Sequence, residues 1–384
     1  MTQSELFEQL SFPIQKIYMQ VENDLLVAIM ARLKTGIDFT GKTLNWNLNK
    51  LHELGGISKD AIKYISKGSK RSKALLGNLM QEIAKGSLKV NGINNEITPG
   101  VERVIKALQA QAENHLNLTN TTMYTATIDA YSVTLNKLES VRNWALSRGV
   151  TELAVGAKGI HSEIASVVHE LADNGITAMV DASGRAWSPE AYVAMNLRTT
   201  TAQVAREAIK EQGKDYGLDV ILVSSHAGAR PGCAPYQGKC FSMSGRRGKI
   251  KDVYGREYEF EPIDITGYNP GTGLNNDPAG LFGINCGHTF RYIEEGSFKN
   301  NEEPIETEAE IVRNRKEYAL SQEQRAIERS IRNDERNADL FKEAGDTAKA
   351  KEYAFRATEK RQEYREFCES NDRTPRWERT RIYA

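Results

Sequence analysis

Cysteine and histidine gather between residues 226 and 288, where their types could support metal binding or thiol chemistry. Four of them, His226, Cys233, Cys286 and His288, offer the thiolate and imidazole groups that hold zinc in tetrahedral sites. The spacing is unusual for such a site, because the chain has no Cys-x-x-Cys pair and Cys286 stands only two positions from His288. Zinc binding is therefore one of three interpretations of this stretch, with these four residues as the predicted ligands.

A second interpretation is nucleophilic catalysis by a cysteine thiolate. Cys286 or Cys233 would be the nucleophile, and His226 or His288 would be the general base. The residue types suit this chemistry, but neither cysteine follows a nucleophile elbow or begins a predicted helix. A zinc-dependent or Cys-based enzyme built on this cluster is therefore kept as the alternative function.

The third interpretation is structural, and the residues around the cluster favour it. Turn-forming residues are frequent here: Gly228, Pro231, Gly232, Pro235 and Gly238. Glycine permits tight turns and proline fixes them, while Arg230 and Gln237 can satisfy buried carbonyl groups. In this interpretation the histidine and cysteine side chains fill a small core in which none of them is charged, and no cofactor is needed.

The segments that precede this stretch are predicted to be mainly helical. Apolar residues recur at three- and four-residue spacing from Ile14 to Ala28, which is typical of an amphipathic helix. Further helices are predicted over three ranges, 61–65, 74–83 and 101–115. The basic segment 67–73 is expected to be a solvated loop between two of them.

Start and stop signals become sharper after residue 140. Gly175 should end one helix, and Ser188 with Pro189 should cap and begin the next. That second helix carries Arg198 and Arg206, eight positions apart and so on about the same side. These arginines could bind a carboxylate or a phosphate, but a solvated helix face is the commoner outcome.

The residue pattern changes from helical to strand-like near residue 217. The run 219–225 has the β-branched composition of a buried strand, and 254–260 alternates like a half-exposed one. Beyond Pro304 dense mixed charge with sparse apolar positions predicts long helices that pack along one narrow seam, broken at Gly345.

These patterns predict an α+β fold in three consecutive parts. They are a largely helical N-terminal region over 1–138, a Gly-rich α+β module over 139–298 with its strand-rich core at 217–298, and a charged helical C-terminal arm over 299–384. Because one compact module lies between two helical stretches, the arms are expected to place the module.

Composition excludes several classes of protein. The 384 residues carry 51 Lys and Arg against 51 Asp and Glu, so the surface as a whole is no trap for nucleic acid. Four cysteines in so long a chain favour a reducing compartment over a disulfide-stapled fold. No signal peptide and no membrane span is predicted, because the clean apolar runs are far too short.

Local basic clusters keep a second alternative open, in which the protein contacts DNA. The candidates are the segments 67–73 and 246–251 and the arginines Arg373, Arg376, Arg379 and Arg381. Neutralising a few phosphates would give salt-sensitive binding, with a slope of about −0.9 per contact.

Motif residues in the module carry a resemblance to a known family. They are His226, Gly228, Arg230 and Pro231, then Gln237, Gly238 and Lys239, and later Asn285, Cys286 and His288. On these residues the chain resembles the phage minor capsid protein 2 family of tailed bacteriophages, which is related to Mu-type head-morphogenesis proteins. The resemblance is strong over 165–298 and weak before residue 140. Two positions depart from the family pattern, since Gly287 replaces a usual Arg and Cys233 stands where relatives often have His.

The resemblance implies a structural, non-enzymatic protein of the virion. Such a protein is made in the host cytoplasm and enters the phage head in low copy near the portal during procapsid assembly. The partners it implies are portal, major capsid and scaffold proteins, together with packaged DNA, and no membrane. The module would then be a rigid contact surface, and the C-terminal helices would be a docking arm.

Overall fold

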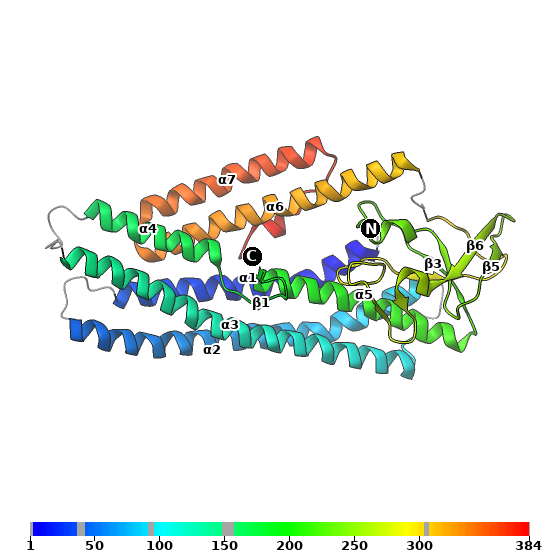
Figure 1. Cartoon of the computed structure of the whole chain (residues 1–384), viewed down its shortest axis with the longest axis horizontal. Coiled ribbons are helices and arrows are strands. Elements are labelled where there is room, and N and C mark those ends of the chain that lie inside the picture. Colours follow the sequence, from blue (N-terminus) through cyan, green and yellow to red (C-terminus); the bar gives the residue numbers. More distant parts are fainter. Residues whose placement is uncertain (1–2, 37–42, 91–95, 148–156, 303–306, 384) are drawn as a thin grey trace. The chain divides into compact units, whose positions relative to one another are not determined.

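A computed structural model describes most of the chain (Figure 1). The described residues are 3–36, 43–90, 96–147, 157–302 and 307–383. No helix in this described part has the length and apolar character needed to cross a bilayer.

Seven α-helices account for most of the described residues (Figure 1). They are α1 (Gln3–Gly36), α2 (Thr43–Val90), α3 (Pro99–Ser147), α4 (Ala157–Asn174), α5 (Pro189–Asp215), α6 (Glu308–Ala344) and α7 (Thr347–Ser370). Short 3-10 helices are η1 (Ala234–Tyr236), η2 (Ile263–Thr266) and η3 (Trp377–Thr380). The predicted α+β class is confirmed, as a mostly helical chain with a small mixed sheet between its helical stretches.

Five of the strands between α5 and α6 form one mixed sheet with the order β5-β6-β4-β3-β9. These strands are β3 (Val220–Val223), β4 (Cys240–Ser242), β5 (Gly248–Lys251), β6 (Glu257–Pro262) and β9 (Phe290–Tyr292). β4 pairs with β6 in parallel and the other neighbours are antiparallel. Two small hairpins complete the strands, β1 (Met179–Val180) with β2 (Ala186–Trp187), and β7 (Tyr268–Asn269) with β8 (Leu274–Asn275).

The chain divides into two compact units that interleave along the sequence. We name them the sheet unit (residues 1–15, 72–116 and 193–322) and the helical unit (residues 16–71, 117–192 and 323–384). The three consecutive domains expected from the sequence, 1–138, 139–298 and 299–384, stay a prediction.

The sheet unit has apolar side chains on both faces of its sheet. Ile221 and Val223 of β3 join one cluster, to which α5 contributes Ile209, while Val220 and Leu222 join a second cluster on the opposite face. Because residues alternate between the two faces of a strand, all four residues of β3 are buried. β3 is therefore packed on both of its faces, and it fixes the start of the loop that follows it.

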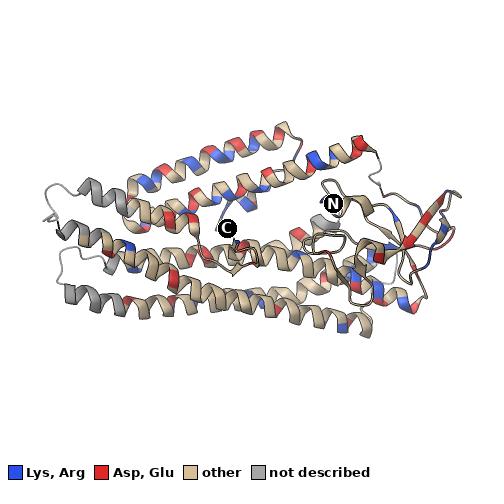
Figure 2. Ribbon diagram, in the orientation of Figure 1, with Lys and Arg blue, Asp and Glu red and all other residues tan. Residues whose placement is uncertain are grey.

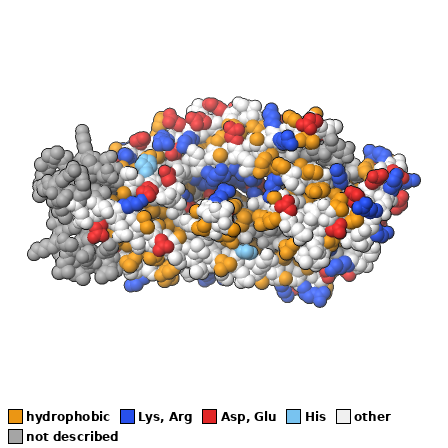
Figure 3. All heavy atoms as spheres, viewed as in Figure 1, with side chains coloured by type: hydrophobic (Ala, Val, Ile, Leu, Met, Phe, Trp, Pro, Cys, Tyr) orange, Lys and Arg blue, Asp and Glu red, His pale blue; other side chains and the backbone are white. Residues whose placement is uncertain are grey.

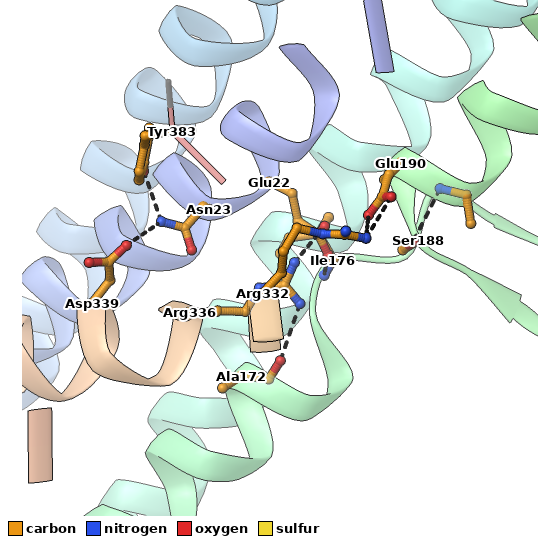
Figure 4. A network of polar contacts seen from close by, with 11 residues as sticks. Glu22, Asn23, Ala172, Ile176, Ser188, Glu190, Arg332, Arg336, Asp339 and Tyr383 are labelled. Atoms are coloured by element: carbon orange, nitrogen blue, oxygen red, sulfur yellow. Dashed lines mark hydrogen bonds and ion pairs between the residues drawn. The ribbon is translucent and has the colours of Figure 1, made fainter. Parts of the chain in front are cut away.

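A buried ion pair connects α1 to α6 in the helical unit (Figure 4). Glu22 accepts a hydrogen bond from Arg336 at 2.8 Å and another from the backbone N–H of Ile176 at 3.1 Å. Gly175 ends α4 with φ +59, and a Cβ there would lie only 2.5 Å from the Glu22 carboxylate. The glycine that was predicted as a helix stop thus also makes room for a buried acid.

Two further contacts in Figure 4 join distant segments of the helical unit. Arg332 holds both carboxylate oxygens of Glu190, at 2.7 and 2.8 Å. The amide of the fully buried Asn23 donates to Asp339 at 2.9 Å and to the hydroxyl of Tyr383 at 2.8 Å. The last residues described in the chain therefore pack on its first helix.

The helix start and stop positions predicted around Gly175, Ser188 and Gly345 are confirmed. The Ser188 hydroxyl accepts from the backbone N–H of Ala191 and Pro189 begins α5, while α4 ends at Asn174 before Gly175. Gly345 separates α6 from α7, as expected, and β3 lies inside the predicted strand 219–225.

One predicted loop is wrong. The basic segment 67–73 lies inside the continuous helix α2, which also joins the two separate helices predicted over 61–65 and 74–83. Gly68 permits close helix packing, because a Cβ there would lie 2.5 Å from the side chain of Val21 in α1. The glycine serves a helix contact and breaks no helix.

The C-terminal helices form the seam expected from their sparse apolar positions. Ile331 of α6 packs with Ala357, Tyr364 and Cys368 of α7 in one buried cluster. Figure 2 shows Lys and Arg positions interspersed with Asp and Glu positions along the ribbons of α6 and α7, and Figure 3 shows side chains of both charges on the face of the molecule that it views.

Candidate functional site

Two loops of the sheet unit bring three of the four predicted ligands together. The loop 224–239 joins β3 to β4 and carries Cys233, while the loop 276–289 joins β8 to β9 and carries Cys286 and His288. The two sulfur atoms lie 3.6 Å apart, and Cys286 Sγ lies 3.4 Å from His288 Nδ1. All three side chains are buried, their ligand atoms lie within 4.8 Å of one another, and both thiols are free.

The fourth predicted ligand, His226, lies beside this cluster. Its ring centroid is 4.3 Å from that of His288, but none of its nitrogens belongs to the group of atoms within 4.8 Å. Cys240, from the same stretch of sequence, lies in the apolar cluster on the opposite face of the sheet. The structure therefore divides the residues that the sequence grouped together.

Gln237 orients the imidazole of His288. The amide oxygen of Gln237 accepts a hydrogen bond from the backbone N–H of His226 at 3.3 Å, and it lies 3.0 Å from His288 Nε2. Because an amide oxygen only accepts, we assign the proton of this contact to Nε2. Nδ1 is therefore the ring nitrogen that faces the sulfur of Cys286.

The surroundings of Cys286 favour a thiolate. Burial raises the pKa of the Cys286 thiol, but the hydrogen bond from Cys233 lowers it. The adjacent His288 and the positive charge of Arg206 lower it further, so this pKa lies well below its usual range. The hydrogen bond to Cys286, together with burial, raises the pKa of Cys233. Of the two sulfurs, Cys286 is therefore the one that loses its proton more readily.

Arg206 is the site residue that sequence reasoning missed. It was expected on a solvated helix face with Arg198, yet its side chain is only 1% exposed. Its guanidinium donates to the carbonyls of Phe282 and His288, both at 3.2 Å, and lies over the Phe282 ring. Arg206 thus satisfies the buried carbonyls, a role that had been assigned to Arg230 and Gln237. Arg198 instead forms an ion pair with Glu8.

The first of the motif residues that carry the family resemblance hold the β3–β4 loop against α6. Gly228 has φ +71, and a Cβ there would lie 3.2 Å from the backbone nitrogen of Tyr318. Next to it the backbone of Ala229 forms two hydrogen bonds with the Asn314 side chain, both 2.8 Å long. Pro231 lines a cavity of about 240 Å³ between this loop and α6, which contains none of the cysteines or histidines of the cluster.

The remaining motif residues make most of their contacts through their backbone. Gly238, with φ +72, and Lys239 pair with Val223 at the end of β3, and the side chain of Lys239 is exposed. Asn285 has φ +59, and its N–H donates to the Thr199 hydroxyl of α5 at 3.0 Å. Asparagine is one of the few residues that tolerate this region. The guanidinium of Arg230 lies 3.7 Å from the Cys233 sulfur.

Acidic neighbours neutralise the basic segment 246–251. Arg246 pairs with Asp219 at 2.7 Å, and Lys249 pairs with Glu257 at the same distance. These side chains are engaged on the surface of the sheet unit, which leaves less net positive charge there than the segment alone indicates.

The family model for phage minor capsid protein 2 matches residues 3–369, which takes in residues from both units and both loops of the cluster. The chain belongs to the phage minor capsid protein 2 family. It is also similar to a protein named "Structural protein" from Lactococcus phage LL-H, with 25% identity over 313 residues that cover 79% of each chain. No solved structure matches it.

This membership confirms the resemblance drawn from the module and extends it over nearly the whole chain, including the residues before 140. The protein is a phage structural protein of the minor capsid class. Membership in a family of structural proteins implies a role other than catalysis. The burial of Cys233 and Cys286 agrees with that role, since each is only 1% exposed.

Proposed function

We propose that this minor capsid protein enters the phage head in low copy near the portal vertex during procapsid assembly. There it contacts portal, major capsid and scaffold proteins. The observation that carries the proposal is the family match over residues 3–369, which includes the charged C-terminal helices as well as the sheet unit. A contact protein of this kind needs closed cores and an exposed surface for partners, and both units have buried apolar clusters.

The outer face of α7 is the docking surface in this proposal. Phe355 is 63% exposed there, amid exposed residues of both charges. Exposed aromatic side chains surrounded by polar ones are typical centres of protein interfaces. Mixed charge around such an anchor sets the specificity and rate of association more than its strength.

The direct test counts the protein in procapsids and in procapsids assembled without portal. We expect few copies per particle, and loss of those copies when the portal is absent. A copy number matching that of the major capsid protein, or full retention without portal, would refute the assignment to the portal vertex.

Two matched variants test the docking surface. Phe355→Glu should reduce incorporation about tenfold, as expected for loss of an interface anchor worth about 1.4 kcal/mol or more. Leu118→Glu, at a residue of α3 with 62% exposure, is the control and should leave incorporation unchanged. Equal incorporation of the two variants would argue against α7 as the docking surface.

Packaged DNA is the other partner that the family resemblance implies. The ion pairs of Arg246 and Lys249 favour protein partners over DNA at that segment. Retention on duplex DNA that falls steeply with salt would restore DNA as a partner, and binding independent of salt would exclude it.

A further inference from the structure

We propose that Cys233, Cys286 and His288 bind one Zn²⁺ ion, with His226 as the fourth ligand. The observation behind this proposal is the convergence of two thiol sulfurs and one imidazole nitrogen from two loops at a single buried point. The proposal goes beyond the role in the phage head and does not depend on it.

The distances between the ligand atoms match those of a tetrahedral zinc site. Zinc lies about 2.3 Å from thiolate sulfur and about 2.0 Å from imidazole nitrogen, so tetrahedral angles place two sulfurs about 3.8 Å apart and sulfur and nitrogen about 3.5 Å apart. The observed separations are 3.6 Å between Cys233 Sγ and Cys286 Sγ, and 3.4 Å between Cys286 Sγ and His288 Nδ1. These two separations would change by only a few tenths of an ångström on binding, and the third, between Cys233 Sγ and the ligand nitrogen of His288, is within 4.8 Å.

The groups around the ligands are those that a zinc site requires. Gln237 accepts from His288 Nε2, and such a contact on the far nitrogen is what orients a metal-bound histidine. The backbone N–H of Phe282 donates to Cys286 Sγ at 3.1 Å. Phe282 has φ +62, a region that bulky residues rarely adopt, and this conformation marks a local strain beside the ligand.

Ligand chemistry selects the metal and the kind of site. Two thiolates and imidazole in tetrahedral geometry favour zinc over the hard cations, which prefer oxygen. His226 is partly exposed beside the buried ring of His288, so it lies where an ion would enter. Binding releases any proton that Cys233 or Cys286 still carries as a thiol. The ion joins two loops, because Cys233 and Cys286 stand 53 residues apart. The proposed role of the ion is therefore structural.

The test uses the full chain, expressed in zinc-supplemented cells and purified without chelator. Elemental mass spectrometry should find about one zinc per chain. Cys286→Ser should lose most of that zinc, whereas Cys240→Ser and Cys368→Ser should keep it, because these buried cysteines lie in other clusters. His226→Ala should weaken zinc binding at least tenfold in competition with a chelating dye.

A second measurement covers the case in which the cysteine variant does not fold. Cobalt added to the chelator-treated wild-type protein should give the visible absorption of tetrahedral Co²⁺ with thiolate ligands, and zinc should displace it. The metal site is overturned if the wild-type chain takes up neither metal, if Cys286→Ser keeps its zinc, or if Cys233 and Cys286 are joined in a disulfide in the native protein. Zinc binding by His226→Ala as tight as that of wild type would overturn His226 as the fourth ligand.

Discussion

Replacing Arg206 with Met tests whether one buried guanidinium holds the loop 276–289 on α5. The substitution removes both hydrogen bonds to the carbonyls of Phe282 and His288 and fills part of the space with an apolar chain. An unsatisfied buried carbonyl costs about 1–3 kcal/mol, so two of them cost about 2–6 kcal/mol. We expect the sheet unit to lose about 4 kcal/mol, near the middle of that range.

Calorimetry or near-ultraviolet circular dichroism would measure this loss as a change in melting temperature. For a unit of this size about 1 kcal/mol corresponds to roughly 2–4 °C, so Arg206→Met should melt about 8–16 °C lower than wild type. Lys214→Met is the control on the same helix, because the Lys214–Glu211 pair is largely exposed and its loss should shift melting by less than about 2 °C. If the two variants melted alike, the guanidinium would not hold the loop 276–289.

Three further predictions concern the pH dependence of stability, the steric contact at Gly228 and the attachment of the β3–β4 loop to α6. Burial raises the pKa of Glu22 above its usual range, so this acid stabilises the fold below its unfolded pKa and that contribution is lost as pH rises through the folded pKa; the melting advantage of wild type over Glu22→Gln should therefore shrink as pH rises above the ordinary glutamate pKa of about 4.3, and an advantage that grew with pH would contradict this sign. Gly228→Ala should cost about 1–2 kcal/mol more than Gly245→Ala in chemical denaturation, because both glycines have positive φ but only Gly228 meets backbone atoms; equal costs would remove α6 as the cause. Asn314→Leu should speed hydrogen exchange at the Ala229 amide at least tenfold by removing its 2.8 Å partner, whereas unchanged exchange would show that the loop is held without it.

Local signals in the sequence predicted the ends of the helices better than their lengths. Ser188 and Gly345 act through contacts within a few residues, so their roles can be read directly from the chain. The basic segment 67–73 was wrongly predicted as a loop, because its sequence does not show that Gly68 contacts Val21 on a different helix. A glycine that ends a helix and one that admits a neighbour look the same until the tertiary contact is known.

The candidate site was predictable in its residue types and only partly in its geometry. Cys233, Cys286 and His288 were named from the sequence and they do meet. The burial of Arg206 could not be inferred, because its partners are carbonyls 76 and 82 positions further along the chain. Backbone carbonyls carry no signature in a sequence, so an arginine that binds them resembles one that faces solvent.

The contact of Tyr383 with Asn23 has a consequence for the order in which the protein folds. These partners stand 360 positions apart in the sequence, and Glu22 and Arg336 stand 314 positions apart. At 5–20 residues per second a ribosome needs about 20–70 s to travel that distance, so Glu22 and Asn23 are synthesised long before their partners near the end of the chain. The sheet-unit residues 193–322 are complete earlier. During synthesis the helical unit is therefore the last to be completed, and Glu22 and Asn23 spend that time without their native partners.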